Sequence, residues 1–197
     1  MLTIIGDVHG KHDEYLRIVE GRTASVRVGD FGFDYHILDN VDSANHKLIG
    51  GNHDNYNTIG NYPHYLGDFG TATVGGVSFF FVRGELSVDK HLRHAGVNWW
   101  PQEEMDWGKM YNAIDAYAEA KPSVVISHGC PADVLPFFVT NSMKITPSRT
   151  AQMLDTMWMA HRPKCWFFGH HHNTETLVVG DCVFQCLNEL ETIDISV

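Results

Sequence analysis

The sequence predicts an α/β fold in which two mixed β-sheets pack against each other and helices cover the outside. Two observations support this prediction. In the first half, short apolar strands run into turns that carry glycine and a polar residue, as in open α/β folds. In the second half, a predicted hairpin and several short strands near the end add antiparallel pairs to the pattern.

The first fifty residues are expected to contain three strands and one helix. The strands are residues 2–5, 24–28 and 47–49, and each leads into a turn that contains glycine. Residues 11–20 are expected to form a helix, because the apolar residues between Tyr15 and Val19 supply one apolar side. Side chains that follow these strands should gather in the crevice beyond the strand ends.

The rest of the chain is expected to alternate hairpin, helix and strand. Gly75-Gly76 suits a hairpin turn, because glycine accepts positive φ. Pro101 fits the first turn of a helix over 101–120, and Pro122 follows its end. The remaining expected elements are hairpin strands at 71–74 and 77–82, a strand at 123–127, a helix from Thr146 that Pro163 ends, a strand at 164–168 and terminal strands at 176–179, 183–187 and 192–197.

Composition and charge indicate one soluble globular domain over residues 1–197, since no repeat, low-complexity segment or linker divides the chain. The 197 residues are 44% hydrophobic and 19% charged, an ordinary globular balance. Apolar runs are too short to cross a membrane and the N-terminus lacks signal-peptide features, so we expect a cytoplasmic location. The net charge of −10 disfavours long nucleic acids as partners but does not exclude a small phosphate substrate.

Five polar segments lie beside glycines, most of them directly after a predicted strand. They are Gly6-Asp7-Val8-His9-Gly10, Gly29-Asp30, Gly51-Asn52-His53-Asp54, Ser127-His128-Gly129 and Gly169-His170-His171-His172. Each segment alone arises by chance in many proteins, but their number and order predict a dinuclear metal site, with a decayed or accidental site as the alternative. Aspartate, asparagine and histidine ligands suit Mn²⁺, Fe²⁺, Zn²⁺, Ni²⁺ or Co²⁺ rather than Ca²⁺.

In this order the segments resemble the signature of the calcineurin-like metallophosphoesterase superfamily. That signature is Asp-x-His, Gly-Asp, Gly-Asn-His-(Asp/Glu), a lone His and Gly-His-x-His, and the resemblance spans Asp7 to His172. A weaker similarity, over residues 82–101, is to small stand-alone members from bacteria and phages. The resemblance implies a four-layer αββα sandwich and two divalent metal ions, with Mn²⁺ as the first candidate. It also implies the ligand sets: Asp7, His9 and His172 for the first metal, Asn52, His128 and His170 for the second, and Asp30 as the bridge.

Two ions about 3.5–4 Å apart can hold a water between them and lower its pKa, so a metal-bridging hydroxide is the expected nucleophile. His53 follows a ligand and is expected to protonate the leaving alkoxide, the alternative being a turn residue that only bonds backbone. Asp54 is expected to hydrogen-bond His53 and raise its pKa, or else to serve as a turn or N-cap carboxylate. His171 should point away from the ligands, because in an extended segment His170 and His172 face the same way.

Arg83 and Arg93 are candidate phosphate-binding residues, and solvated loop charges are the alternative. Trp99 and Trp100 are expected to pack a loop against the core rather than to stack on a nucleobase. The segment Gly29-Asp30-Phe31-Gly32-Phe33-Asp34 lacks the Asp-Arg-Gly of the protein-phosphatase branch, which argues against a Ser/Thr phosphoprotein phosphatase.

The sequence therefore predicts a metal-dependent phosphomonoesterase or phosphodiesterase for a small or exposed phosphoester, such as a nucleotide or cyclic nucleotide. The rival is a non-enzymatic interaction scaffold of the same fold. A scaffold has no reason to keep His53 together with a complete ligand set, so the enzyme is favoured.

Overall fold

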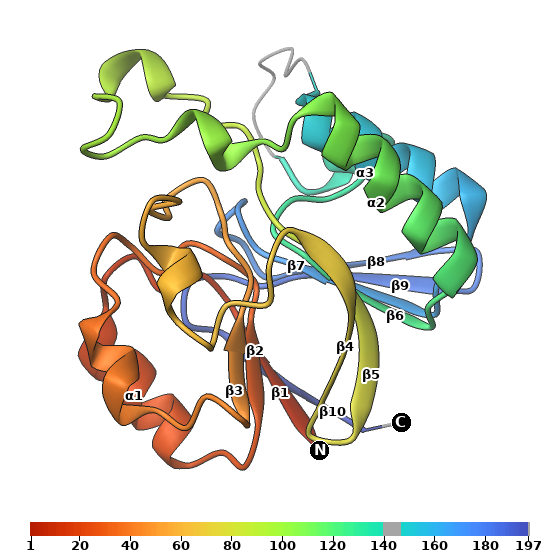
Figure 1. Ribbon diagram of the computed structural model, residues 1–197. Helices are drawn as coiled ribbons and strands as arrows, with labels where there is room; N and C mark the ends of the chain where they lie inside the picture. Colours follow the sequence, from red (N-terminus) through yellow and green to blue (C-terminus); the bar gives the residue numbers. More distant parts are fainter. Residues whose placement is uncertain (140–146, 197) are drawn as a thin grey trace.

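The computed structural model describes residues 1–139 and 147–196, in which two β-sheets face each other and helices cover their outer sides (Figure 1). The helices are α1 (His12–Glu20), α2 (Trp107–Ala120) and α3 (Arg149–Ala160). The strands are β1 (Leu2–Ile5), β2 (Ser25–Arg27), β3 (His46–Leu48), β4 (Phe69–Val74), β5 (Val77–Val82), β6 (Val124–Ser127), β7 (Cys165–Phe168), β8 (Glu175–Val179), β9 (Cys182–Cys186) and β10 (Thr192–Ile195).

One sheet has the strand order β10-β1-β2-β3 and the other has the order β4-β5-β6-β7-β9-β8. Both sheets are mixed, because β10, β4 and β8 pair antiparallel with β1, β5 and β9, while the other neighbours run parallel. Helix α1 covers the smaller sheet, and α2 and α3 cover the larger one (Figure 1). The predicted four-layer αββα sandwich is therefore confirmed.

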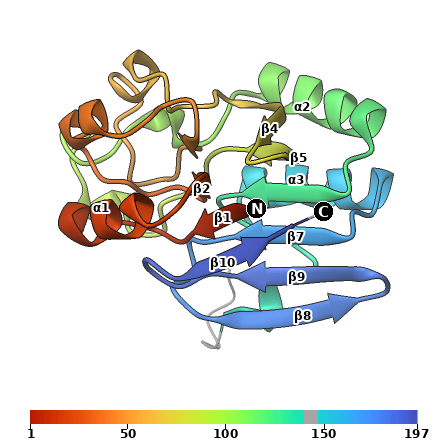
Figure 2. The same cartoon turned by 90° about the horizontal axis from the view of Figure 1, so that it is seen from below.

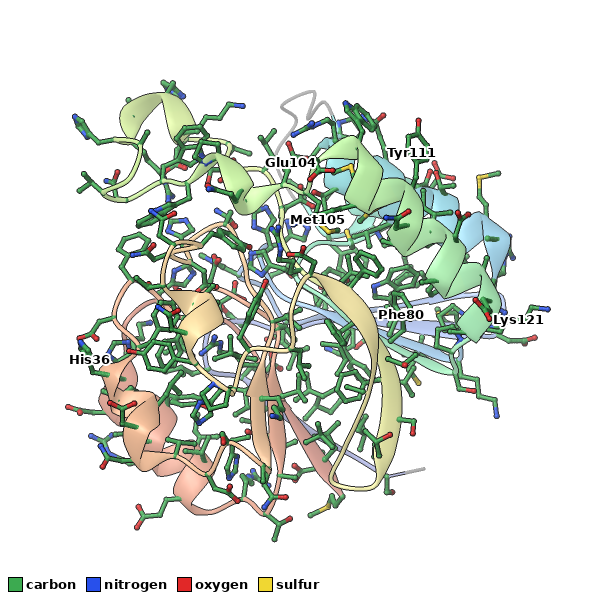
Figure 3. The ribbon with its side chains drawn as sticks, viewed as in Figure 1. His36, Phe80, Glu104, Met105, Tyr111 and Lys121 are labelled. Carbon is green, nitrogen blue, oxygen red and sulfur yellow. The ribbon has the colours of Figure 1, made fainter. Side chains whose placement is uncertain are left out.

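The apolar runs of the sequence fill three cores between these layers. Along β5, Phe79 and Phe81 point into the core between the two sheets, whereas Phe80 points toward α2, where its ring packs edge-on against Tyr117 (Figure 3). A strand buried on both faces has no polar alternation, which explains the run Phe79-Phe80-Phe81. The third core lies under α1 and includes Tyr15 and Val19.

The parallel strands bring their carboxyl ends to one edge of the sandwich. Asp7, Asp30 and Asn52 follow β1, β2 and β3 of the smaller sheet, and His128 and His170 follow β6 and β7 of the larger sheet. The fold therefore delivers polar residues that are far apart in the sequence to one place between the sheets.

The hairpin prediction is confirmed, since Gly75 and Gly76 connect β4 to β5 with φ of 58° and 80°. The three predicted terminal strands are also confirmed, as β8, β9 and β10. They divide between the sheets, because β8 and β9 belong to the larger sheet, whereas β10 pairs with β1 and brings the two ends of the chain together (Figure 2). In the part of the chain described here, the helices are too short or too polar to cross a membrane.

The helix expected over 101–120 begins only at Trp107. Pro101 starts a separate 3₁₀ turn, and the chain is extended again at Glu104. Asp106 then caps α2 by accepting a hydrogen bond from the Lys109 backbone N–H at 3.0 Å. The expected start of the next helix at Thr146 lies outside the described residues, and α3 is capped by Ser148.

Candidate metal centre

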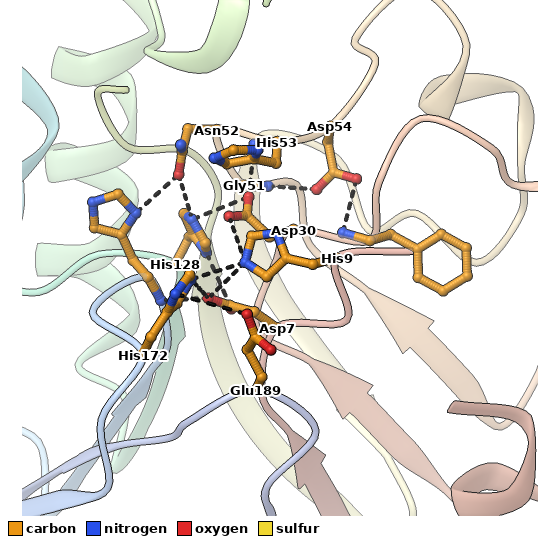
Figure 4. Close-up of polar contacts among 12 residues, drawn as sticks. Asp7, His9, Asp30, Gly51, Asn52, His53, Asp54, His128, His172 and Glu189 are labelled. Atoms are coloured by element: carbon orange, nitrogen blue, oxygen red, sulfur yellow. Dashed lines mark hydrogen bonds and ion pairs between the residues drawn. The ribbon is translucent and has the colours of Figure 1, made fainter. Parts of the chain in front are cut away.

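All seven predicted ligands lie together at the carboxyl edge of the two sheets (Figure 4). Donor atoms within 4.8 Å of one another form two groups that share Asp30. The first group contains Asp7, His9, Asp30 and His172, and the second contains Asp30, His128 and His170. Asn52 completes the second group, because its Oδ1 lies 2.9 Å from both His128 Nε2 and His170 Nδ1.

In the first group the donor atoms point at one another. The Nε2 atoms of His9 and His172 are 2.8 Å apart, and His172 Nε2 is 3.4 Å from Asp7 Oδ2. His9 Nε2 is also 3.6 Å from Asp30 Oδ2, so Asp30 faces the first group with one oxygen. Its other oxygen, Oδ1, lies 3.3 Å from His128 Nε2 in the second group.

The tautomer of His128 shows that these residues fit a cation. His128 Nδ1 lies 2.9 Å from the Val28 carbonyl oxygen, which can only accept, so Nδ1 carries the proton. Burial lowers the pKa of His128 to about 4, so the ring is neutral near pH 7 and Nε2 carries a lone pair. That lone pair faces Asn52 Oδ1 and the Asp30 carboxylate with no proton to share, an arrangement that a metal ion stabilises.

The carboxylates give a second indication. Asp7 Oδ1 is buried and has no hydrogen-bond partner among the described residues. Burial, together with the charges of Asp7 and Asp54, raises the pKa of Asp30 well above its usual value. Two buried carboxylates this close repel each other, and divalent cations would remove that cost.

The backbone of the centre is strained in four of its seven ligands. His9, Asp30, His170 and His172 have φ of 47°, 48°, 64° and 49°, a region that non-glycine residues seldom adopt. The segment from His170 to His172 is therefore a bend, and the expectation that it is extended is wrong. His171 is in neither donor group: its Nε2 lies 3.6 Å from Cys130 Sγ, and its ring packs edge-on against that of His170 at 4.9 Å.

At three of the glycines beside the ligands, a side chain would collide with a ligand. A Cβ atom on Gly51 would lie 2.1 Å from Asp30 Oδ1, and one on Gly169 would lie 2.2 Å from Asp7 Oδ1. A Cβ atom on Gly29 would lie 2.2 Å from the His128 ring.

His53 lies at the edge of the centre and contacts Arg93, not Asp54. Its backbone N–H donates to Asp30 Oδ1 at 2.7 Å, and the Arg93 guanidinium lies 2.9 and 2.5 Å from the two ring nitrogens. Asp89 in turn pairs with Arg93 at 2.8 Å. Burial and the charge of Arg93 lower the pKa of His53 to about 3, which corrects the expectation that the pKa is raised.

Asp54 has a structural role and does not form a hydrogen bond with His53. Its carboxylate accepts from the backbone N–H groups of Gly51 at 2.8 Å and Phe31 at 3.2 Å (Figure 4). It also accepts from the Tyr35 hydroxyl at 2.8 Å. The alternative of a turn carboxylate therefore describes it, because these bonds tie together the two turns that carry Asp30 and Asn52.

Arg83 is neither a phosphate-binding residue nor a solvated loop charge. It is buried, pairs with Asp68 at 2.5 Å, donates to the Gln102 carbonyl and stacks over the Tyr56 ring at 4.4 Å. Trp100 is buried with its ring 5.1 Å from that of Phe33, which agrees with a packing role.

A pocket of about 330 Å³ opens beside the centre. Asp30, Asn52, His53 and Arg93 form the polar end next to the predicted ligands. The rest of the lining is mixed. Its apolar residues are Leu86, Val88, Leu135, Val139 and Ala151, and its polar residues include Asp89, Ser148 and His170 to His172. Glu85 also lines it, and burial raises the pKa of this carboxyl to about 7.

Two residues that sequence reasoning did not assign to the site contact Asn52 in series. Asn52 Nδ2 donates to the Ser87 hydroxyl at 3.1 Å, and that hydroxyl donates to Glu103 Oε2 at 2.6 Å. Ser87 lies in the stretch between Arg83 and Arg93, where its residue type alone indicates no part in metal binding. Nothing in the pattern around Glu103 indicated a role, because the contact depends on how two loops meet.

Comparison with known proteins identifies a matching family and solved structures of similar fold. The model of the calcineurin-like phosphoesterase family matches residues 1–174. Phosphopantetheinyl hydrolase from Mycobacterium tuberculosis has a similar structure, with a TM-score of 0.54 and 13% identity over 95% of this chain and 89% of that one. An archaeal phosphodiesterase matches with a TM-score of 0.43 and 13% identity, over 95% of this chain and 83% of that one.

A predicted phosphoesterase from Streptococcus pneumoniae gives a TM-score of 0.39 and 14% identity, over 95% of this chain and 72% of that one. No curated protein sequence matches the chain significantly. The family match covers most of the chain and contains all seven predicted ligands. The chain therefore belongs to the calcineurin-like phosphoesterase family.

Proposed function

We propose that this chain is a dinuclear metal-dependent phosphoesterase that hydrolyses a small phosphomonoester or phosphodiester. The observation that carries the proposal is the arrangement of donor atoms in two groups that share Asp30. When bound, two divalent ions, with Mn²⁺ as the first candidate, would neutralise phosphate charge and lower the pKa of a water toward neutrality.

In this proposal the residues of the chain divide the remaining work. Arg93 is held by Asp89 at the polar end of the pocket, where its guanidinium can donate to phosphate oxygens. His53 protonates the leaving oxygen. Its lowered pKa applies to the protein without substrate, and a bound phosphate beside it would raise that pKa, because an opposite charge favours the protonated ring.

The pocket supports a compact substrate. A volume of about 330 Å³ is at the small end of ligand sites, which suits a leaving group of modest size. The apolar part of its wall favours a leaving group with apolar surface, and the carboxyl groups of Glu85 and Asp89 would disfavour one that carries a second anionic group. A folded phosphoprotein does not suit such a pocket, and the missing Asp-Arg-Gly argues in the same direction.

The test is reconstitution with Mn²⁺ followed by elemental analysis and by assays on p-nitrophenyl phosphate and bis(p-nitrophenyl) phosphate. We expect about two ions per chain and turnover of at least one substrate. Asp30→Asn should weaken both metal sites, since Asp30 contributes to both groups. Asp181→Asn, in the exposed turn between β8 and β9, is the matched control and should behave as wild type. A stoichiometry near zero without turnover would overturn the proposal.

A further inference from the structure

Asn52 can serve as a metal ligand only if its amide faces the right way. The oxygen Oδ1 carries lone pairs for a metal, whereas the Nδ2 group has only donor hydrogens. The two ends have nearly the same shape, so packing alone does not choose between them. What chooses is the chemistry of the groups that each end meets.

The Nδ2 end meets a chain of two buried residues. Asn52 Nδ2 lies 3.1 Å from Ser87 Oγ, and Ser87 Oγ lies 2.6 Å from Glu103 Oε2. The Ser87 backbone N–H, which can only donate, lies 3.1 Å from Glu103 Oε1. Asn52, Ser87 and Glu103 are 4%, 1% and 2% exposed, so water does not compete for these bonds.

The direction of each bond follows from these contacts. A separation of 2.6 Å is typical of a hydroxyl that donates to an ionised carboxylate. Ser87 has one hydroxyl hydrogen, and Glu103 takes it, so Ser87 Oγ can only accept from Asn52. The amide must then present Nδ2 to Ser87 and Oδ1 to His128 and His170, both of which lie 2.9 Å away.

We propose that Glu103 and Ser87 are positioning residues for the second metal site: the Glu103 carboxylate orients the Ser87 hydroxyl, which fixes the Asn52 amide with its oxygen toward His128 and His170. This inference rests on the proposed metal centre. It assigns Glu103 a part in metal binding although Glu103 is not itself placed among the donor atoms.

The sharpest variant is Glu103→Gln, which keeps the shape of the side chain. The Ser87 backbone N–H still requires an oxygen opposite it, so the new amide must place its NH₂ group against Ser87 Oγ. The hydroxyl hydrogen is then displaced toward Asn52, which must turn its oxygen to Ser87 and its NH₂ group to the histidines. One change of oxygen to nitrogen therefore reverses the direction of every bond in the series.

The experiment is titration of the metal-free chain with Mn²⁺, followed by calorimetry and by the spin-coupled signal of the manganese pair in electron paramagnetic resonance. In Glu103→Gln and Ser87→Ala we expect the affinity for one of the two ions to fall about 10–100-fold, the usual effect of losing a residue that orients a ligand. The other ion should bind as in wild type, and the coupled signal should disappear at limiting metal.

Glu104→Gln is the matched control, because Glu104 is the adjacent buried glutamate but bonds Thr150 and Arg149 instead. A second test uses Asn52→Asp, whose two oxygens make orientation irrelevant. In that background Glu103→Gln should no longer lower the affinity for Mn²⁺. This result would separate a positioning role of Glu103 from a general loss of packing.

Two results would overturn the inference: wild-type affinity for both ions in folded Glu103→Gln, or an equal loss in the Asn52→Asp background. If instead the wild-type chain binds no metal, the proposed function fails. If Glu103→Gln does not fold, Ser87→Ala decides by the same titration.

Discussion

His53 contacts the metal centre through its backbone and a cation through its ring. Its backbone N–H supports the shared ligand Asp30, while its ring contacts the Arg93 cation at 2.9 and 2.5 Å. The guanidinium can only donate, so it favours an unprotonated ring nitrogen. A general acid in this position depends on the substrate to supply the negative charge that makes the ring accept a proton. Proton transfer would then be available only when phosphate occupies the pocket.

This arrangement predicts the behaviour of His53→Ala in the Mn²⁺-loaded protein. Both ions should stay bound, and turnover of a substrate with an alkoxide leaving group should fall by about 10²–10⁴-fold, the usual contribution of a positioned acid. The loss should be much smaller with p-nitrophenyl phosphate, because p-nitrophenolate leaves without a proton. The measurements are initial rates on both substrates and metal content.

His91→Ala is the control, because His91 is exposed on the same loop as Arg93. Equal losses on the two substrates with both ions retained would assign His53 to electrostatic stabilisation. Loss of the ions would place its role in the support of Asp30.

At the scale of single residues, the sequence identified donor atoms better than their neighbours. Asp7, His9 and Asp30 could be predicted as ligands because ligand residue types beside glycine form a local pattern. The role of Arg83 could not be predicted, since an arginine after a strand looks the same in sequence whether it faces substrate or, as here, Asp68 and the Tyr56 ring. Partners chosen by the packing of distant loops leave no local pattern.

At the scale of elements, the strand ends decide the geometry of the centre. The two sheets contribute ligands from β1, β2 and β3 on one side and from β6 and β7 on the other. Each strand stops where a turn with positive φ or a glycine begins, so the ligands stand on short turns anchored in buried strands. This rigidity is what a dinuclear site needs, because its donor atoms must be in place before the metals arrive.

The start of α2 is a helix boundary that the apolar periodicity of the sequence does not predict. Apolar spacing extends back to Met105, which is buried but lies before the helix. The signal that decides is Asp106, a favoured N-cap residue, whose carboxylate accepts the Lys109 backbone N–H at 3.0 Å. Proline at position 101 suggested an earlier start but begins only a 3₁₀ turn.

The cap predicts a measurable effect on stability. Asp106→Ala should lower the free energy of unfolding by about 1 kcal/mol, because the Lys109 backbone N–H loses its acceptor. For a chain of this size the midpoint of thermal unfolding should fall by about 2–4 °C. Asp106→Asn keeps an acceptor and should stay close to wild type. Equal midpoints for the alanine and asparagine variants would show that the cap does not stabilise α2.

At the scale of the whole molecule, the layered arrangement could be predicted but the path of the last strand could not. The strand and turn pattern indicated two mixed sheets. The apolar run Phe79-Phe80-Phe81 fits this arrangement, because both faces of β5 are buried. The pairing of β10 with β1 joins residues 187 to 193 positions apart, from Ile5 with Thr192 to Leu2 with Ile195, and no local preference encodes it. That pairing closes the smaller sheet on the side opposite β3.

Gathering so many imidazoles inside the fold makes its stability sensitive to acid. His128 is fully buried, and burial lowers its pKa to about 4, against about 6.5 in an unfolded chain. Between these two values the unfolded state binds a proton that the folded state does not. Stability is therefore intact above pH 6.5 and is lost as the pH falls toward 4, by about 1.4 kcal/mol per pH unit for this one group.

Urea unfolding of the metal-free chain at pH values between 7 and 5 measures this effect. The free energy of unfolding should decrease steadily with acid, and His128→Gln should show a shallower decrease than wild type, because glutamine takes up no proton. His91→Gln is the control, since His91 is exposed, and it should keep the wild-type slope. The metal-free chain is used because an ion binds His128 only while the ring is neutral, so bound metal would change the pH dependence of unfolding. If the free energy of unfolding falls equally with pH in wild type and His128→Gln, the prediction is wrong. The His128 ring would then take up its proton in the folded state at the pH where an exposed histidine does.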